Sequence, residues 1–319
     1  MVTICIIAIF KNECHILKEF ITHYLNQGVD HFLFIDNGSN DGYFNILEYY
    51  INNNIVTLQI DSKKGAQIEL YNKYYLEKCK IYDWVIICDL DEFIYARRNF
   101  KSIKEYLNTL NDSISQVVIP WKTFGSSGFN TLEKKQPDSV IKNFIKRANY
   151  NNNLGFVERT AKSIVKTQYL TYICIHLHGI SNNNNIGPDY SSNNICNYVF
   201  NLNNIVANNE TSLSTDFLHL NHYRIQSYDW FMRVKVTRGD AFETSRDSGR
   251  NEHYYKRIDE LSNDIDDFEL FNINKYFDWE YYLDTYPDLR ANGIYTEKQA
   301  LEHWNFYGKK EGRCSCKEK

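Results

Sequence analysis

Residues 84–93 of the chain are Trp84-Val85-Ile86-Ile87-Cys88-Asp89-Leu90-Asp91-Glu92-Phe93, an apolar run of strand length that ends in two aspartates separated by one residue. Continuous apolar runs of this kind are typical of buried strands in a parallel sheet. Ligands of open α/β sheets bind at the carboxyl ends of such strands. Two carboxylates at that position, with nothing basic beside them in the sequence, require a cation. The pattern therefore predicts a Mg²⁺ or Mn²⁺ ion that bridges the aspartates and a diphosphate.

The segments before Asp89 alternate between strand and helix patterns. Strands are expected at residues 2–10, 31–36, 55–60 and 84–88, with helices from about Glu13, near 46–51 and between 66 and 79. β-α units in this order predict an α/β fold, with a Rossmann-like, mostly parallel sheet covered by helices on both faces. Further strands near 162–165 and 169–176 alternate enough to be antiparallel, and the Asn-rich stretch 182–209 is expected to be a long loop.

Composition and charge exclude several classes of protein. The chain has 319 residues and a formal net charge of −4, so it lacks the basic character of a nucleic-acid-binding protein. The apolar run 2–10 is too short to span a membrane, and it lacks the basic start and the cleavage site of a signal peptide. We therefore expect no transmembrane segment and a cytoplasmic location, in a bacterium or in a virus-infected cell.

The chain is expected to divide into two parts, residues 1–271 and residues 272–319. In the second part Thr296-Glu297-Lys298-Gln299 fits a capping box, and Gly308 is a plausible end for the helix that starts there. The second part is therefore predicted to be a small helical module.

Several motifs come directly after expected strands or late in the chain. They are Phe10-Lys11-Asn12-Glu13, Ile35-Asp36-Asn37-Gly38-Ser39-Asn40-Asp41-Gly42, Asp89-Leu90-Asp91-Glu92-Phe93, Trp121-Lys122-Thr123-Phe124-Gly125-Ser126-Ser127-Gly128, Asn221-His222-Tyr223-Arg224, Ser227, and Lys235 followed by Arg238-Gly239. Together they resemble the GT-A fold glycosyltransferases, specifically the family-2-like and family-92-like group, over about residues 1–245.

The resemblance implies a role for each matching residue. It places Asn12 and Glu13 near the nucleotide, Asp36 on the base or ribose, and Asp89 on the ribose or the metal. Asp91 would bind the metal at the diphosphate, His222 would bind the metal or a phosphate, and Gly125 to Gly128 would shape the sugar and acceptor side. A bound cation would stabilise the charge that develops on the diphosphate as the glycosidic bond breaks.

The general base has no clear match to the family pattern. Glu158, in Phe156-Val157-Glu158-Arg159, is the candidate that takes the proton of the acceptor hydroxyl, although its neighbour is Arg159 and not a second acid. His176 and His178 alternate on one expected strand and so share a face. They are either metal ligands or hydrogen-bonded structural residues.

The function expected from this resemblance is a metal-dependent glycosyltransferase of the hexosyltransferase type. It would move a sugar from a nucleoside-diphosphate sugar, with UDP favoured, to a hydroxyl on a glycan, lipid-linked or protein acceptor. One alternative is a non-catalytic sugar-binding protein that kept the fold. Another is a haloacid-dehalogenase-like phosphatase, but Phe93 stands where those enzymes usually carry Thr or Val, and three expected strands precede the Asp-x-Asp motif.

Overall fold

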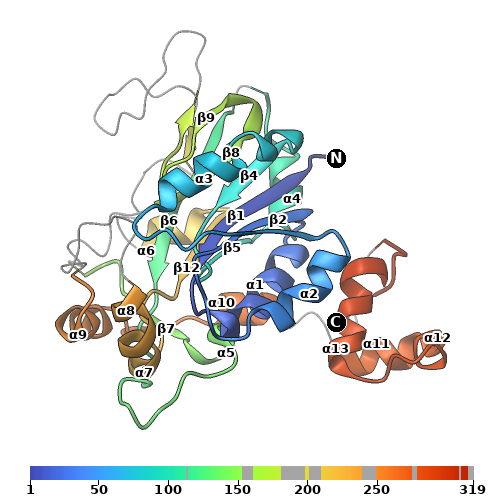
Figure 1. Cartoon of the computed structure of the whole chain (residues 1–319). Coiled ribbons are helices and arrows are strands. Elements are labelled where there is room, and N and C mark those ends of the chain that lie inside the picture. The colour runs from blue at the N-terminus through green and yellow to red at the C-terminus, as the bar shows by residue number, and fades with distance from the viewer. Residues whose placement is uncertain are drawn as a thin grey trace. The chain divides into compact units, whose positions relative to one another are not determined.

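Four parallel strands from the N-terminal third of the chain form one half of the central sheet. They are β1 (Ile4–Phe10), β2 (His31–Asp36), β3 (Val56–Ile60) and β4 (Trp84–Ile87), in the spatial order β3-β2-β1-β4 (Figure 1). The side chains of β1, β2 and β4 are largely apolar and buried, as continuous apolar runs in a parallel sheet require, whereas β3 at the edge of the sheet is only partly buried. The prediction of a Rossmann-like, mostly parallel sheet flanked by helices is confirmed.

The coordinates are a computed structural model that describes residues 1–112, 114–152, 161–180, 198–200, 210–238, 249–274, 279–308 and 310–314. The expected loop 182–209 lies mostly outside these residues. Within it, β11 (Tyr198–Phe200) pairs with β6 (Gln116–Thr123).

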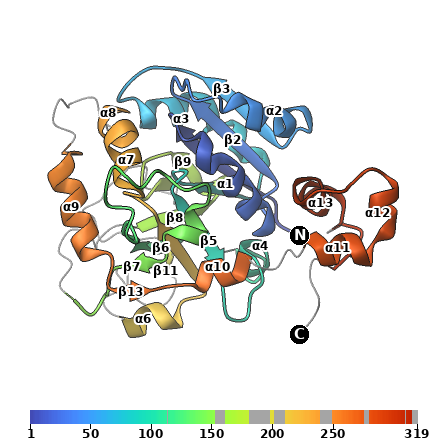
Figure 2. The same ribbon diagram turned by 90° about the horizontal axis from the view of Figure 1, so that it is seen from below.

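Helices cover both faces of the parallel half of the sheet (Figure 2). On one face, Leu70, Tyr71 and Tyr75 of α3 (Gln67–Tyr75) pack with the β1, β2 and β4 side chains that include Ile7 and Ile35. On the opposite face, α1 (Cys14–Asn26) packs its Phe20 ring against Phe32 and Phe34 of β2. Because successive strand residues point to opposite faces, each strand serves both layers.

The second half of the sheet brings a late strand next to the aspartates. Beyond β4 the order continues β8 (Ala161–Lys166), β6, β12 (Leu218–His222) and β5 (Glu92–Ala96). β8 is antiparallel to both β4 and β6, as predicted for 162–165, while β12 runs parallel to β6 and antiparallel to β5. The register places His222 opposite Glu92. Neither β5 nor β12 was expected, because their pairing joins segments far apart in the sequence.

Shorter elements complete the first part of the chain. They are α2 (Phe44–Asn52), the 3₁₀ turns Lys78–Ile81 and Thr167–Tyr169, α4 (Ile103–Leu107), α5 (Val140–Asn143), β7 (Lys146–Arg147), β9 (Leu170–Tyr172), β10 (Gly179–Ile180), α6 (Glu210–Thr215), α7 (Tyr228–Trp230), a π-helical turn at Phe231–Lys235, α8 (Val236–Arg238), α9 (Glu252–Leu261) and β13 (Ile265–Asp266).

The chain divides into two compact units, Met1–Asp266 and Asp267–Lys319, so the boundary falls five residues before the expected one. The second unit contains α10 (Glu269–Asn274), α11 (Trp279–Thr285), α12 (Pro287–Ala291), α13 (Glu297–His303) and a π-helical turn at Trp304–Gly308. Its core includes Tyr282, Leu283, Leu289 and Ala300, and Thr296 forms the expected capping box with Gln299. In neither unit does a described helix have the length and apolar character needed to cross a membrane.

One buried acid in the first unit predicts a pH dependence of stability. Burial raises the pKa of Asp216 from its ordinary value of 3.8 to about 7, an effect that Arg97 and Arg98 only partly oppose. The folded chain therefore holds a proton that the unfolded chain releases, so stability is lost as the pH rises from about 4 to about 7. We expect Asp216→Asn to raise the melting temperature more at pH 8 than at pH 5 in thermal unfolding. An equal gain at both pH values would contradict this assignment.

Candidate active site

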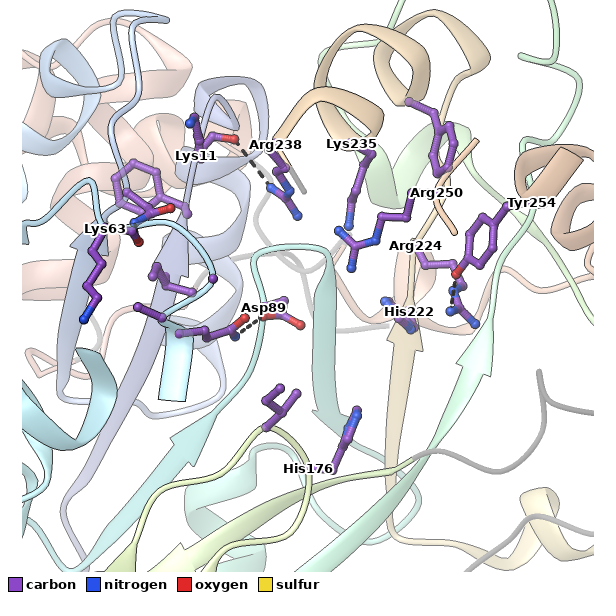
Figure 3. A pocket seen from close by; sticks show the side chains of 18 of the residues that line it. Lys11, Lys63, Asp89, His176, His222, Arg224, Lys235, Arg238, Arg250 and Tyr254 are labelled. Carbon is purple, nitrogen blue, oxygen red and sulfur yellow. Dashed lines mark hydrogen bonds between the residues drawn. The ribbon is translucent and has the colours of Figure 1, made fainter. Parts of the chain in front are cut away.

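A pocket opens at the carboxyl ends of the parallel strands (Figure 3). Phe10 at the end of β1, Asn37 after β2, Asp89 after β4 and His222 at the end of β12 all line it. This is the edge at which open α/β sheets bind ligands. Six Lys and Arg side chains lie among the described lining residues, against Asp89 as the single carboxylate there: they are Lys11, Lys63, Arg224, Lys235, Arg238 and Arg250. The pocket therefore suits an anionic ligand.

Asp89 is fixed by a buried lysine from β8. Its Oδ2 lies 3.3 Å from Lys162 Nζ, and its Oδ1 accepts a hydrogen bond of 3.1 Å from Gln67. Burial opposes the charge of Asp89, but the nearby charges of Lys162 and Lys235 together hold the pKa of this carboxyl below its ordinary value. Lys162 Nζ also lies 3.3 Å from Glu92 Oε2, and burial raises the pKa of Glu92 to about 8. Lys162 is thus the buried cation that lies beside both Asp89 and Glu92.

Asp91 pairs with Lys235, which lies 144 residues further along the chain. Lys235 Nζ donates to Asp91 Oδ2, and both side chains are buried. The other carboxylate oxygen, Oδ1, is buried without a hydrogen-bond partner. No basic residue stands next to the aspartates in the sequence, but the expectation that they lack a basic neighbour is wrong for the folded chain. Folding brings Lys162 to them from β8 and Lys235 from the π-helical turn.

His222 faces Asp91 as a neutral imidazole. Its Nε2 lies 3.7 Å from Asp91 Oδ1, and its ring packs on Trp121 with the ring centroids 4.1 Å apart. Burial, together with the charges of Arg224 and Lys235, holds the pKa of His222 well below its ordinary value. The pairing of β12 with β5 explains this position, since it sets His222 beside Glu92 and so next to Asp91.

Asn12 and Glu13, from the motif that follows β1, contribute to the pocket only indirectly. Glu13 is buried and forms an ion pair of 2.6 Å with Arg238, whose guanidinium lines the pocket. Asn12, in the left-handed backbone region at φ 54°, accepts a hydrogen bond from the Asn40 amide. Neither Asn12 nor Glu13 lines the pocket; Glu13 supports its wall through Arg238, and Asn12 holds the turn that follows β2.

Asp36 stabilises the turn that follows β2. Its Oδ1 accepts from the Ser39 amide at 2.8 Å, and its Oδ2 accepts from the Tyr43 hydroxyl at 3.0 Å. The side chain is buried and does not line the pocket; Asn37, the next residue, does. The turn therefore reaches the pocket through a different residue from the one expected.

The glycine loop that was expected around the sugar packs instead against another segment of the same chain. A Cβ atom on Gly125 would lie 2.5 Å from the Ser262 carbonyl oxygen, so only glycine fits there. Gly128 has φ +92°, a conformation that favours glycine. Neither glycine lines the pocket, and the close approach at Gly125 is to the segment that follows α9.

The remaining candidates are His176, His178 and Glu158, and of the two histidines only His176 is found in the pocket wall. His176 lines the pocket, and burial lowers its pKa to about 4. His178 does not line it, and its Nδ1 accepts a 3.0 Å hydrogen bond from the Cys174 amide. Glu158 lies outside the described residues.

Several pocket residues had no role in the sequence predictions. Arg250 and Tyr254 line the pocket from the region of α9, and Lys162 lies behind Asp89. A lysine at a buried strand position signals a paired charge, because lysine is almost never fully buried unpaired. That signal identifies Lys162 as important but not its partners.

A doubly covered α/β sheet with a cationic pocket at the carboxyl ends of its strands is typical of nucleotide-binding folds. Residues 1–268 match the family model of glycosyltransferase family 92, and the chain belongs to this family. The resemblance seen in the sequence is thereby confirmed, and the phosphatase alternative is excluded.

Solved structures show a more distant likeness. S. aureus TarS 1–349 is 15% identical over 52% of this chain and 48% of that chain, with a TM-score of 0.35, and its complex with UDP is 16% identical over 52% and 47%, also at 0.35. GalNAc-T7 with UDP, GalNAc and Mn²⁺ is 14% identical over 39% and 24%, at 0.28. The chain thus spans about half the length of the TarS 1–349 chain that it matches. No match to a curated protein sequence was found.

Proposed function

We propose that this glycosyltransferase is metal-dependent and moves a hexose from a nucleoside-diphosphate sugar, preferentially a UDP-sugar, to a hydroxyl acceptor. The observation that carries the proposal is the opposition of Asp91 Oδ1 and His222 Nε2, 3.7 Å apart, at the wall of a pocket lined by cations; His222 lines the pocket and Asp91 is buried behind it. The acceptor hydroxyl belongs to a glycan, lipid or protein, and we place the reaction in the cytoplasm.

The residues fit Mn²⁺ or Mg²⁺ as a partial site. Among the described residues no group of three or more His, Cys, Asp or Glu side chains is arranged to hold a metal ion. Asp91 nevertheless offers a buried oxygen without a partner, and His222 offers a neutral imidazole. Ions that retain water and take further ligands from substrate phosphates need only one or two protein ligands. The metal would neutralise the negative charge that develops on the leaving diphosphate.

The cations support diphosphate binding from the side opposite the sheet. Lys235 and Arg238 come from consecutive helical turns and lie three residues apart, so they share one face above the pocket (Figure 3). Glu13 holds Arg238 in place through their 2.6 Å ion pair. We propose that Lys235 and Arg238 bind phosphate oxygens, because cationic side chains form strong charge-assisted hydrogen bonds with them.

The nucleoside is assigned to the other end of the pocket. Lys63 marks that end in Figure 3, and Phe10, Lys11, Asn37 and Gln67 also line the pocket. Gln67 also donates to Asp89, so the nucleoside end and the metal end share one hydrogen-bonded wall. This arrangement supports a role for Asp89 at the ribose.

The donor assignment is tested by thermal shift with UDP-, GDP-, CMP- and dTDP-sugars, each with and without Mn²⁺. A ligand that binds the folded state raises the melting temperature by mass action. We expect the largest increase with a UDP-sugar and Mn²⁺ together, followed by metal-dependent hydrolysis of that donor. Binding without hydrolysis or transfer to any acceptor would favour the non-catalytic sugar-binding protein.

We further propose Glu158 as the general base, on the sequence argument alone. Glu158→Gln removes the carboxylate that would accept the proton of the acceptor hydroxyl. We expect transfer to fall by about 100-fold or more while donor affinity stays within twofold, since general-base catalysis typically contributes a factor of about 10²–10⁴. Steady-state kinetics and donor titration measure the two quantities. Unchanged turnover would assign the base elsewhere.

A further inference from the structure

Arg224 is an arginine held in a fixed position between two aromatic side chains. Its guanidinium carbon lies 5.5 Å from the centroid of the Trp121 ring and 5.4 Å from that of Tyr254. Its Nη2 donates to the Tyr254 hydroxyl. Arginine stacks well on aromatic faces, and stacking here leaves the edge of the planar fork available for hydrogen bonds.

No described carboxylate pairs with Arg224, although Asp89, Asp91 and Glu13 in the same region each have a cationic partner. The Tyr254 hydroxyl accepts one of its hydrogen bonds, whereas a guanidinium has five N–H donors. The guanidinium lines the pocket. His222 and His176 line the same pocket.

Arg224 lies at the sugar end of the pocket under the proposed orientation of the donor. Figure 3 places Arg224 and Tyr254 on the side opposite Lys11 and Lys63, with Asp89 and Arg238 between them. A donor whose nucleoside contacts the Lys63 side and whose diphosphate lies at Lys235 would extend its sugar toward Arg224.

We propose that Arg224 binds an anionic group, a carboxylate or phosphate, carried by the saccharide at this end of the pocket. Arginine recognises both groups through paired hydrogen bonds. The saccharide is either the donor sugar, as in a nucleoside-diphosphate uronic acid, or the acceptor. The inference rests on the proposed function, since that function orients the donor.

The first arm of the test examines the donor. Affinities of UDP, UDP-glucose and UDP-glucuronate, each with Mn²⁺, are measured by calorimetry for the wild type, Arg224→Met and Arg224→Lys. If the anion is on the donor, Arg224→Met lowers UDP-glucuronate affinity at least about tenfold and leaves UDP and UDP-glucose within twofold, while Arg224→Lys falls between. Arg233→Met is the matched control, because Arg233 pairs with Asp229, is 67% exposed and does not line the pocket.

The second arm examines the acceptor. Glucose, glucuronate and glucose 6-phosphate are added to the complex with UDP and Mn²⁺, and the melting temperature is recorded. If the anion is on the acceptor, the acidic sugars raise the melting temperature of the wild type and of Arg233→Met more than glucose does, and this difference disappears in Arg224→Met.

Three results separate the possible failures. If Arg224→Met weakens UDP itself as much as UDP-glucuronate, Arg224 binds the diphosphate and the inference is overturned. If Arg224→Met matches the wild type with every probe, Arg224 is a packing residue and the inference is again overturned. If the wild type binds neither UDP nor its sugars, the proposed function fails first.

Discussion

Asp91→Asn should abolish the Mn²⁺ dependence of UDP-sugar binding and lower turnover by about 100-fold or more. The substitution keeps the shape of the side chain but removes the anionic oxygen that faces His222 Nε2 at 3.7 Å. Hard divalent cations bind carboxylates in preference to neutral amides, and loss of one electrostatic contact to a transition state typically costs a factor of about 10²–10³. Steady-state kinetics with and without chelator, and donor titration at varied Mn²⁺, measure the effect.

Two further variants make the Asp91 result interpretable. Asp91→Asn leaves Lys235 buried without its partner, which can destabilise the fold. The double variant Asp91→Asn/Lys235→Gln removes both charges and should remain folded, but without metal-dependent binding. Asp112→Asn, at a fully exposed acid, is the control and should behave as the wild type. Near-normal transfer by a folded Asp91→Asn protein would show that Asp91 is not the metal ligand.

Lys162→Met should lower the free energy of unfolding by about 3 kcal/mol, the scale measured when one partner of a buried ion pair is removed. Lys162 is 1% exposed and lies 3.3 Å from both Asp89 Oδ2 and Glu92 Oε2. Methionine fills the space of the aliphatic chain but leaves Asp89 without its counter-ion. Glu92, whose pKa is raised to about 8, is largely protonated at neutral pH, so the loss comes mainly from Asp89.

Lys166→Met, on the same strand, is the matched control for Lys162. Lys166 pairs with Asp112, which is fully exposed, and exposed pairs add little to stability. Urea unfolding at pH 7 compares the two variants with the wild type. Equal losses in both would mean that Lys162 contributes through packing and not through its charge.

The site was only partly predictable, because the local sequence pattern around a residue does not always show whether its side chain faces the ligand. Asp89 and Asp91 follow an apolar strand, and this local pattern fixed their place at the sheet edge and in the pocket region. Asp36 showed an equally clear turn pattern, yet its oxygens bond Ser39 and Tyr43 within that turn. A local motif therefore indicates where the chain turns, but not which of its side chains faces the ligand.

The sequence by itself determined the parallel strands β1 to β4, the helices that cover them and the position of the Asp-x-Asp motif, because apolar periodicity and turn residues act over a few neighbours. Only the tertiary structure decided the charge balance around that motif. Lys162 and Lys235 lie 73 and 144 residues from their aspartates, and His222 reaches Asp91 only through the pairing of β12 with β5. Such contacts depend on strand order and register across the whole sheet, which no local pattern specifies.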